Sequence, residues 1–264
     1  MEYVRFGGLK VSRFIIGSNP FSGFSHQGPE MDQRMMHYYS VDRIKKTLVE
    51  AERLGINSIV ARTDHHVMRM LMEHRDGGGA LQWFAQTCPE VGPQQMCVER
   101  AIKGQAVACH LHGGVMDHLH ANGRLREIIP VVEMVRQAGM LAAVAAHNSE
   151  VIRWAMDNLE LDYFMCSYYN PIPRGMNPEH VSGLEEVYLE EDRRAMTDLI
   201  QELPAPVIHY KIMAAGRNNP AEALRFATGK MRENDAVCVG IYNESKPGML
   251  EEDISLLERC LAAV

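Results

Sequence analysis

Short apolar runs alternate with amphipathic segments along the whole chain, and this alternation is the feature that most constrains the fold. The runs are short enough for strands, whereas the segments between them repeat their apolar residues at helical spacing, as in Ile44, Leu48 and Ala51. Strands that alternate with helices form a parallel sheet, and eight such units close into a barrel. The expected strands are residues 13–17, 58–61, 95–98, 106–112, 141–146, 163–167, 207–210 and 236–240.

The length of 264 residues fits a single (β/α)8 barrel, for which about 250 residues are typical. We therefore expect one domain over residues 1–264, with helices that include 42–54, 125–137, 149–158 and 220–228. Segments 21–39, 77–81 and 171–189 have the composition of insertions over one face. The first and last are long, and loops of that length in a compact barrel are usually covers of a functional site.

The composition excludes several classes of protein. A net charge of −7 argues against nucleic-acid and anionic-membrane partners. We expect neither a signal peptide nor a membrane span, because no stretch approaches the required apolar length. The six cysteines form no CxxC pair, and most lie in apolar runs, which favours a reducing cytoplasm. The expected partner is a small-molecule substrate, and a homo-oligomer stays open.

Five segments carry a resemblance that extends over nearly the whole chain: GLKVSRFIIGSNPFSG, ERLGINSIVARTDHH, VACHLHGG, FMCSYYNPI and VCVGIYNESKPGMLEEDI. In this order they resemble the strand ends of an aldo-keto reductase barrel. The resemblance implies a TIM barrel preceded by an N-terminal hairpin. It also implies a catalytic Asp, Tyr, Lys and His at fixed strand ends.

Only the histidine of that catalytic set finds a match, at His112. Val60 stands at the Asp position, His65 or His66 stands near the Tyr position, and the expected third strand ends at Glu99 without a Lys. The family's last loop holds the phosphate of NADP. Here that loop carries Glu244, Ser245 and Lys246, and the acids at 251–253 lie near the family's phosphate-reading arginine. These departures argue against a nicotinamide cofactor, of which NADP would be the expected one.

Histidines are frequent where the expected strands end. Period-two alternation places His110 and His112 on one side of their strand and does the same for His209 and Lys211. Imidazole together with carboxylate suits Zn, Mn, Fe or Co, although each histidine could also be an ordinary polar residue bonded to a loop carbonyl. The expected metal ligands are Glu99, His110, His112, His147 and His209.

Other polar residues at these ends are candidates for substrate binding and proton transfer. We expect Asp64, His65, His112 or Lys211 to act in catalysis. Lys211 could instead form a Schiff base, stabilise an enolate or pair with Glu99. His26, His37 and His180 are expected to be exposed loop residues, with substrate contact as the alternative. The expected substrate-binding residues are Asn19, Arg62, Tyr169, Asn170 and Arg217.

Three functional hypotheses follow. The leading one is a metal-dependent lyase, isomerase or hydrolase acting on a small polyol, sugar-derived or carbonyl substrate in carbohydrate metabolism. The alternative is a divergent NAD(P)H-dependent oxidoreductase that uses His112 with His65 or Tyr169 as the acid. The third is a barrel that binds a ligand without catalysis.

Overall fold

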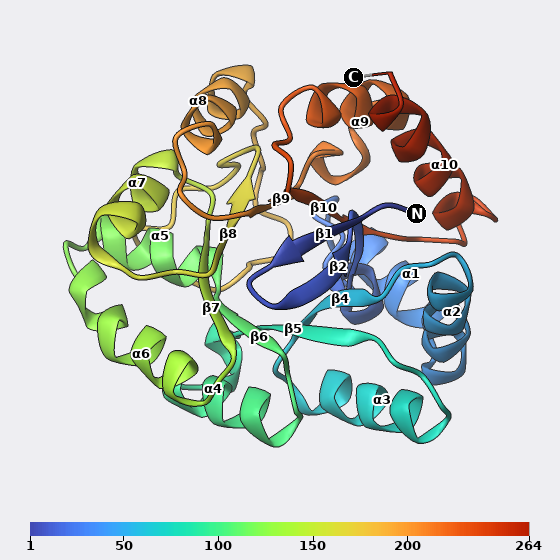
Figure 1. The fold of residues 1–264 in the computed structure, drawn as a ribbon, viewed down its shortest axis with the longest axis horizontal. Coiled ribbons are helices and arrows are strands. Elements are labelled where there is room, and N and C mark those ends of the chain that lie inside the picture. The colour runs from blue at the N-terminus through green and yellow to red at the C-terminus, as the bar shows by residue number, and fades with distance from the viewer. Residues whose placement is uncertain (264) are drawn as a thin grey trace.

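Eight parallel strands close into a barrel in the computed structural model, which describes residues 1–263 (Figure 1). Around the barrel the order is β10-β3-β4-β5-β6-β7-β8-β9. The sequence prediction of a (β/α)8 barrel is thereby confirmed. The strands are β3 (Phe14–Gly17), β4 (Ser58–Arg62), β5 (Gln82–Gln86), β6 (Ala108–Leu111), β7 (Leu141–Ala146), β8 (Tyr163–Ser167), β9 (Val207–Tyr210) and β10 (Ala236–Gly240).

Helices surround the barrel (Figure 1). The first of the outer ring begins after Ser40, whose hydroxyl accepts a hydrogen bond from the backbone of Arg43, and it buries the stripe that begins at Ile44. The helices are α1 (Pro29–Tyr38), α2 (Val41–Arg53), α3 (His65–Asp76), α4 (Gln94–Lys103), α5 (Gly113–Ala121), α6 (Ile129–Gln137), α7 (Ser149–Asn158), α8 (Glu190–Ile200), α9 (Pro220–Thr228) and α10 (Met249–Leu261), with short 3-10 turns η1 (Asn19–Ser22), η2 (Pro89–Val91), η3 (Leu125–Ile128) and η4 (Ala214–Gly216).

The predicted third strand, residues 95–98, is wrong, because these residues belong to α4. Cys97, Val98 and Ala101 form the buried face of that helix, and a short apolar run fits either structure. The third strand is β5, whose Trp83 donates a hydrogen bond of 2.9 Å to the carbonyl of Ala61. Residues 77–81 are therefore the connection from α3 into β5 at the amino end of the barrel, not an insertion over the pocket face.

An antiparallel hairpin of β1 (Tyr3–Phe6) and β2 (Leu9–Ser12) closes the amino end of the barrel. The ring of Phe6 lies 6.1 Å from that of Phe84 and 5.7 Å from that of Tyr163, centroid to centroid. In Figure 1 this blue hairpin crosses the middle of the ring of strands. The hairpin thus leaves only the carboxyl end of the barrel open for a site.

The two long loops meet over that carboxyl end. The first, residues 21–39, contains α1, and its Asp32 accepts a hydrogen bond from Ser182 of the second loop, residues 171–189. His26 of the first loop lies 2.7 Å from Glu186 of the second, nitrogen to oxygen. The two loops are therefore joined to each other, and residues of both line the pocket at this end. None of the described helices is long and apolar enough to cross a membrane.

Replacing Phe6 by Ala should lower the free energy of unfolding by about 3–5 kcal/mol, because it leaves a cavity between the hairpin and the barrel. Urea-induced unfolding followed by circular dichroism measures this loss. The matched control is Arg5→Ala on the same hairpin, an exposed position at which we expect a change within about 0.5 kcal/mol. If Phe6→Ala lowers the free energy of unfolding no more than Arg5→Ala does, the packing of Phe6 does not stabilise the barrel.

Candidate functional site

A pocket of about 500 Å³ lies at the carboxyl end of the barrel. Strand ends supply part of its wall, and the two long loops supply its roof. His112, His147 and Lys211 are among the lining residues, and so are Arg62 and Asn19 from the list predicted for substrate binding. Ligand sites of (β/α)8 barrels lie at this face, so the pocket is the candidate functional site.

His147, which directly follows β7, is held by a buried carboxylate that sequence reasoning missed. Its Nδ1 lies 2.7 Å from Oδ2 of Asp117 in α5, and its backbone N–H and that of Asn148 also donate to Asp117, at 3.2 Å. Burial lowers the pKa of His147, whereas the bond to Asp117 acts in the opposite direction. The signal was an acid within the apolar helix sequence GGVMDHLHA.

Gly113 allows this pair to sit where it does. A Cβ atom at this residue would lie 3.0 Å from Cε1 of His147 and 2.9 Å from the hydroxyl of Tyr210. A side chain at position 113 would therefore push the imidazole away from the pocket. The glycine pair that opens α5 is thus required by the close approach of the helix to the strand ends.

His112 lines the pocket and has a buried ring nitrogen without a partner among the described residues. Its backbone N–H donates to the hydroxyl of Thr87 at 2.9 Å, but its side-chain Nδ1 has no hydrogen-bond partner in the described chain. Burial holds the pKa of His112 well below its ordinary value, and the neighbouring His147 and Arg62 act in the same direction. The imidazole is therefore neutral at physiological pH.

Arg62 supplies fixed positive charge to the same wall. Its Nε lies 3.0 Å from Asp64 and its Nη2 lies 2.9 Å from Glu90, while its guanidinium stacks 4.5 Å from the ring centre of Phe24. Two carboxylates and an aromatic ring therefore hold the guanidinium at the pocket. Its role in binding a substrate stays a prediction.

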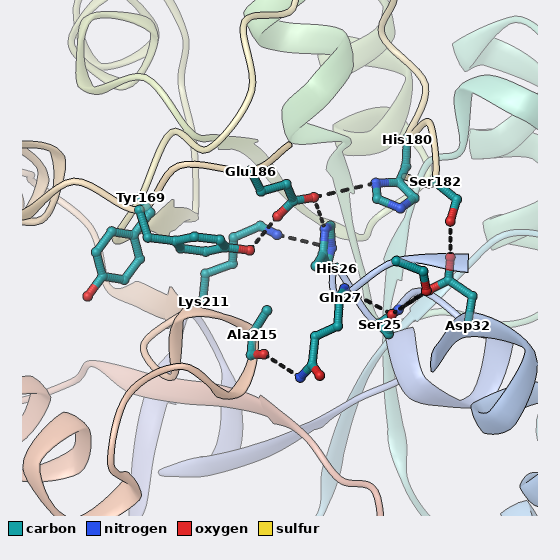
Figure 2. A network of polar contacts seen from close by, with 12 residues as sticks. Ser25, His26, Gln27, Asp32, Tyr169, His180, Ser182, Glu186, Lys211 and Ala215 are labelled. Carbon is teal, nitrogen blue, oxygen red and sulfur yellow. Dashed lines mark hydrogen bonds and ion pairs between the residues drawn. The ribbon is translucent and has the colours of Figure 1, made fainter. Parts of the chain in front are cut away.

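Lys211 reaches the pocket because the backbone leaves the strand conformation directly after β9. Its φ of 56° is left-handed, so the alternation along the strand no longer applies to it. Its Nζ lies 3.0 Å from Nε2 of His26, as Figure 2 shows. Burial lowers the pKa of Lys211 to about 8, opposed by the charge of Glu186.

The predicted set of metal ligands does not assemble, and this prediction is wrong. Glu99 lies exposed on α4, since the third strand is β5. His110 points into the barrel but bonds the hydroxyl of Tyr163 at 3.0 Å. His209 points outward, where it lies 3.0 Å from the hydroxyl of Tyr168 and 3.3 Å from Asp235. Within residues 1–263, neither these three nor His112 and His147 belong to a group close enough to share an ion.

The remaining predicted residues lie around the pocket, and none of them is part of its lining. His65 is exposed in the first turn of α3, and Asp64 caps that helix by accepting from Val67 at 2.9 Å, so neither lines the pocket. Tyr169 is buried and accepts a hydrogen bond from Asn218. Outside the pocket, Asn170 bonds Asp192 through its backbone, and Arg217 donates to the carbonyl of His26 and stacks on Tyr188.

The histidines of the long loops differ from expectation in two of three cases. His37 is exposed, as predicted. His26 and His180 are mostly buried, with side chains 12% exposed, and both approach the carboxylate of Glu186, which is 3% exposed (Figure 2). Their rings lie 4.6 Å apart, centroid to centroid. The sequence could not show this grouping, because the residues lie on different loops.

No family model and no curated protein matches the sequence. Solved structures do: a putative aldo-keto reductase from Pseudomonas aeruginosa superposes with a TM-score of 0.67 at 16% identity, covering 98% of this chain and 96% of that one. The aldo-keto reductase AKR11C1 from Bacillus halodurans gives 0.62 at 13% identity, with coverage of 98% and 91%. The chain has an aldo-keto-reductase-like fold.

The same barrel also resembles a truncated 3-deoxy-D-arabino-heptulosonate 7-phosphate synthase from Thermotoga maritima, with a TM-score of 0.56 at 11% identity and coverage of 98% and 90%. The scaffold alone therefore does not fix the reaction. The catalytic set implied by the resemblance remains incomplete in the structure. With the strand corrected, Gln86 ends the third strand, so no lysine stands there either.

Buried neutral histidines should make the protein less stable in mild acid. Burial lowers the pKa of His110 to about 3, whereas the unfolded chain takes up a proton near its ordinary value of about 6.5. The stability that depends on neutral His110 is present above about pH 6.5 and is lost by about 1.4 kcal/mol per pH unit as the pH falls toward 3. Urea unfolding at several pH values in wild type and His110→Gln measures this slope. A variant that keeps the full slope would contradict the assignment.

Proposed function

We propose that this protein is an oxidoreductase that uses a nicotinamide dinucleotide on a small carbonyl or hydroxyl compound. The observation that carries the proposal is the continuity of the pocket. It extends from His112 and His147 to the loop and helix that follow β10, where Ser245, Lys246 and Asp253 line it. In the aldo-keto reductases that this chain resembles, the corresponding loop holds the phosphate of the nucleotide, which supports the proposal, and the similar structures support the shared fold.

The residues at the far end of the pocket fit an unphosphorylated ribose better than a ribose phosphate. Lys246 is engaged by Glu252 at 2.5 Å, and burial raises the pKa of Asp253, on the pocket wall, to about 6. Carboxylates accept hydrogen bonds from ribose hydroxyls and repel a phosphate. The fit therefore favours NAD over NADP. When bound, the nicotinamide supplies or accepts the hydride.

His147 is the group that we expect to move the proton. Asp117 holds its Nδ1–H, and this leaves Nε2 as the nitrogen that exchanges a proton with the substrate oxygen. A buried carboxylate in this position orients the imidazole and stabilises its protonated form. Lys211 adds positive charge on the same pocket, where it would stabilise a developing oxyanion. The two long loops limit the access of water.

The other hypotheses have less support. The metal-dependent lyase, isomerase or hydrolase loses the strand-end ligands on which it was based. The non-catalytic barrel predicts a ligand that binds without turnover, so the same assays distinguish it from the oxidoreductase.

We expect NADH to bind at least about tenfold more tightly than NADPH, because the acids at the far end of the pocket oppose a ribose phosphate. A fluorescence titration of the purified protein with each nucleotide measures the ratio. Asp253→Asn should reduce the preference of the protein for NADH over NADPH, because it removes a carboxylate that would repel the ribose phosphate. Glu251→Gln, on the same helix but outside the pocket lining, is the matched control and should leave it unchanged. Absence of saturable binding of either nucleotide would overturn the proposed function.

His147→Ala should lower kcat/KM by about 100-fold or more, since it removes the general acid and base. In alcohol oxidation, wild-type kcat/KM should fall as the pH drops through the lowered pKa of His147, below about 6.5. Asp117→Asn removes an interaction that raises this pKa. In that variant, kcat/KM should therefore fall at a still lower pH than in the wild type. The assay follows NADH formation with a panel of small polyols. An unmoved profile would exclude His147 as the titrating base.

A further inference from the structure

The two long loops bring together three side chains that the proposed function does not use. His26, His180 and Glu186 each offer one atom, and these atoms lie within 4.8 Å of one another. Figure 2 shows both imidazoles joined by dashed lines to the same carboxylate, and the amine of Lys211 joined to His26. Two histidines and one carboxylate are the ligand set of several catalytic zinc sites and of mononuclear iron sites.

We propose that His26, His180 and Glu186 bind one divalent transition-metal ion, of which zinc is the expected kind, at the roof of the pocket. The proposal does not depend on the nicotinamide cofactor. It retains the expectation of a transition metal from the sequence but assigns the ion to loop residues in place of Glu99, His110, His112, His147 and His209.

One nitrogen of the group lacks a partner. Nδ1 of His180 is buried and has no hydrogen-bond partner in the described chain. It lies 3.9 Å from Oε1 of Glu186, which is too long for a hydrogen bond. Buried polar atoms are nearly always paired, so an unpaired nitrogen that faces a carboxylate needs a third participant. A cation between the two atoms would satisfy both.

The spacing of the ligand atoms also supports a bound ion. In a tetrahedral zinc site with bonds of about 2.0–2.1 Å, neighbouring ligand atoms lie about 3.3 Å apart. Here Nδ1 of His26 lies 2.7 Å from Oε1 of Glu186, and Nδ1 of His180 lies 3.9 Å from it. These two distances bracket the required value, and all three ligand atoms lie within 4.8 Å of one another.

The surroundings indicate what the ion would do. His26 and His180 line the pocket, so a position left open on the ion would face a substrate oxygen. Lys211 lies 3.0 Å from Nε2 of His26, so the ion would bind this ring through its other nitrogen, Nδ1. Because the ligands come from both loops, the ion would also tie the loops together over the site.

Titration of the purified full-length protein with Co²⁺ or Zn²⁺ tests the proposal. Visible absorption of bound Co²⁺ reports its coordination, and elemental analysis after dialysis reports stoichiometry. We expect about one ion per chain, with affinity lowered more than about 100-fold in His180→Ala and Glu186→Gln and partly restored in Glu186→Asp. His37→Ala in the first loop and His112→Ala at the strand end should bind as wild type does.

Failure to bind either ion, or equal binding by wild type, His180→Ala and Glu186→Gln, would overturn the proposal and leave a hydrogen-bonded loop contact. Loss of binding in His112→Ala with retention in His180→Ala would overturn it in favour of a strand-end site. Circular dichroism confirms that each variant is folded. Nucleotide titration is a separate readout, so failure of this site and failure of the oxidoreductase proposal are distinguishable.

Discussion

The alternation of side chains along parallel strands decides which polar groups reach the pocket. On β9, Ile208 and Tyr210 face the barrel interior, so His209 between them points to the helix layer and pairs with Asp235. His110 on β6 points into the barrel and bonds Tyr163, whereas His112, just after this strand, lines the pocket at the open end. One residue along a strand therefore decides whether a side chain enters the barrel or the helix layer.

Where the alternation stops, the site gains its most unusual groups. Lys211 enters the pocket through a left-handed residue just past β9, and His26 has a similar φ of 58° in the loop that meets it. Such conformations cost energy in non-glycine residues and persist only when surrounding contacts hold them. Here the contacts are the hydrogen bonds that link Lys211, His26 and Glu186. The strained backbone and the polar network thus support each other.

The sequence predicted the barrel because apolar period and strand length are local properties. It failed at residues 95–98, where a short apolar run could be either helix or strand, and that error placed Glu99 at the site. It also missed Asp117, because an acid in a helix reveals its partner only when the helix is docked beside β7. The grouping of His26, His180 and Glu186 depends on how two loops meet, which no spacing in the sequence encodes.

The two proposed groups stand on different kinds of element. The His147–Asp117 pair joins a strand end to a helix, where packing fixes its geometry, as the proposed proton transfer requires. The His26–His180–Glu186 group joins the two long loops, and Lys211 contacts His26 from the residue that follows β9. Because Lys211 also lines the pocket, a change in the loop group would affect the charge of the pocket through this lysine, whereas a change at Asp117 acts on His147 directly.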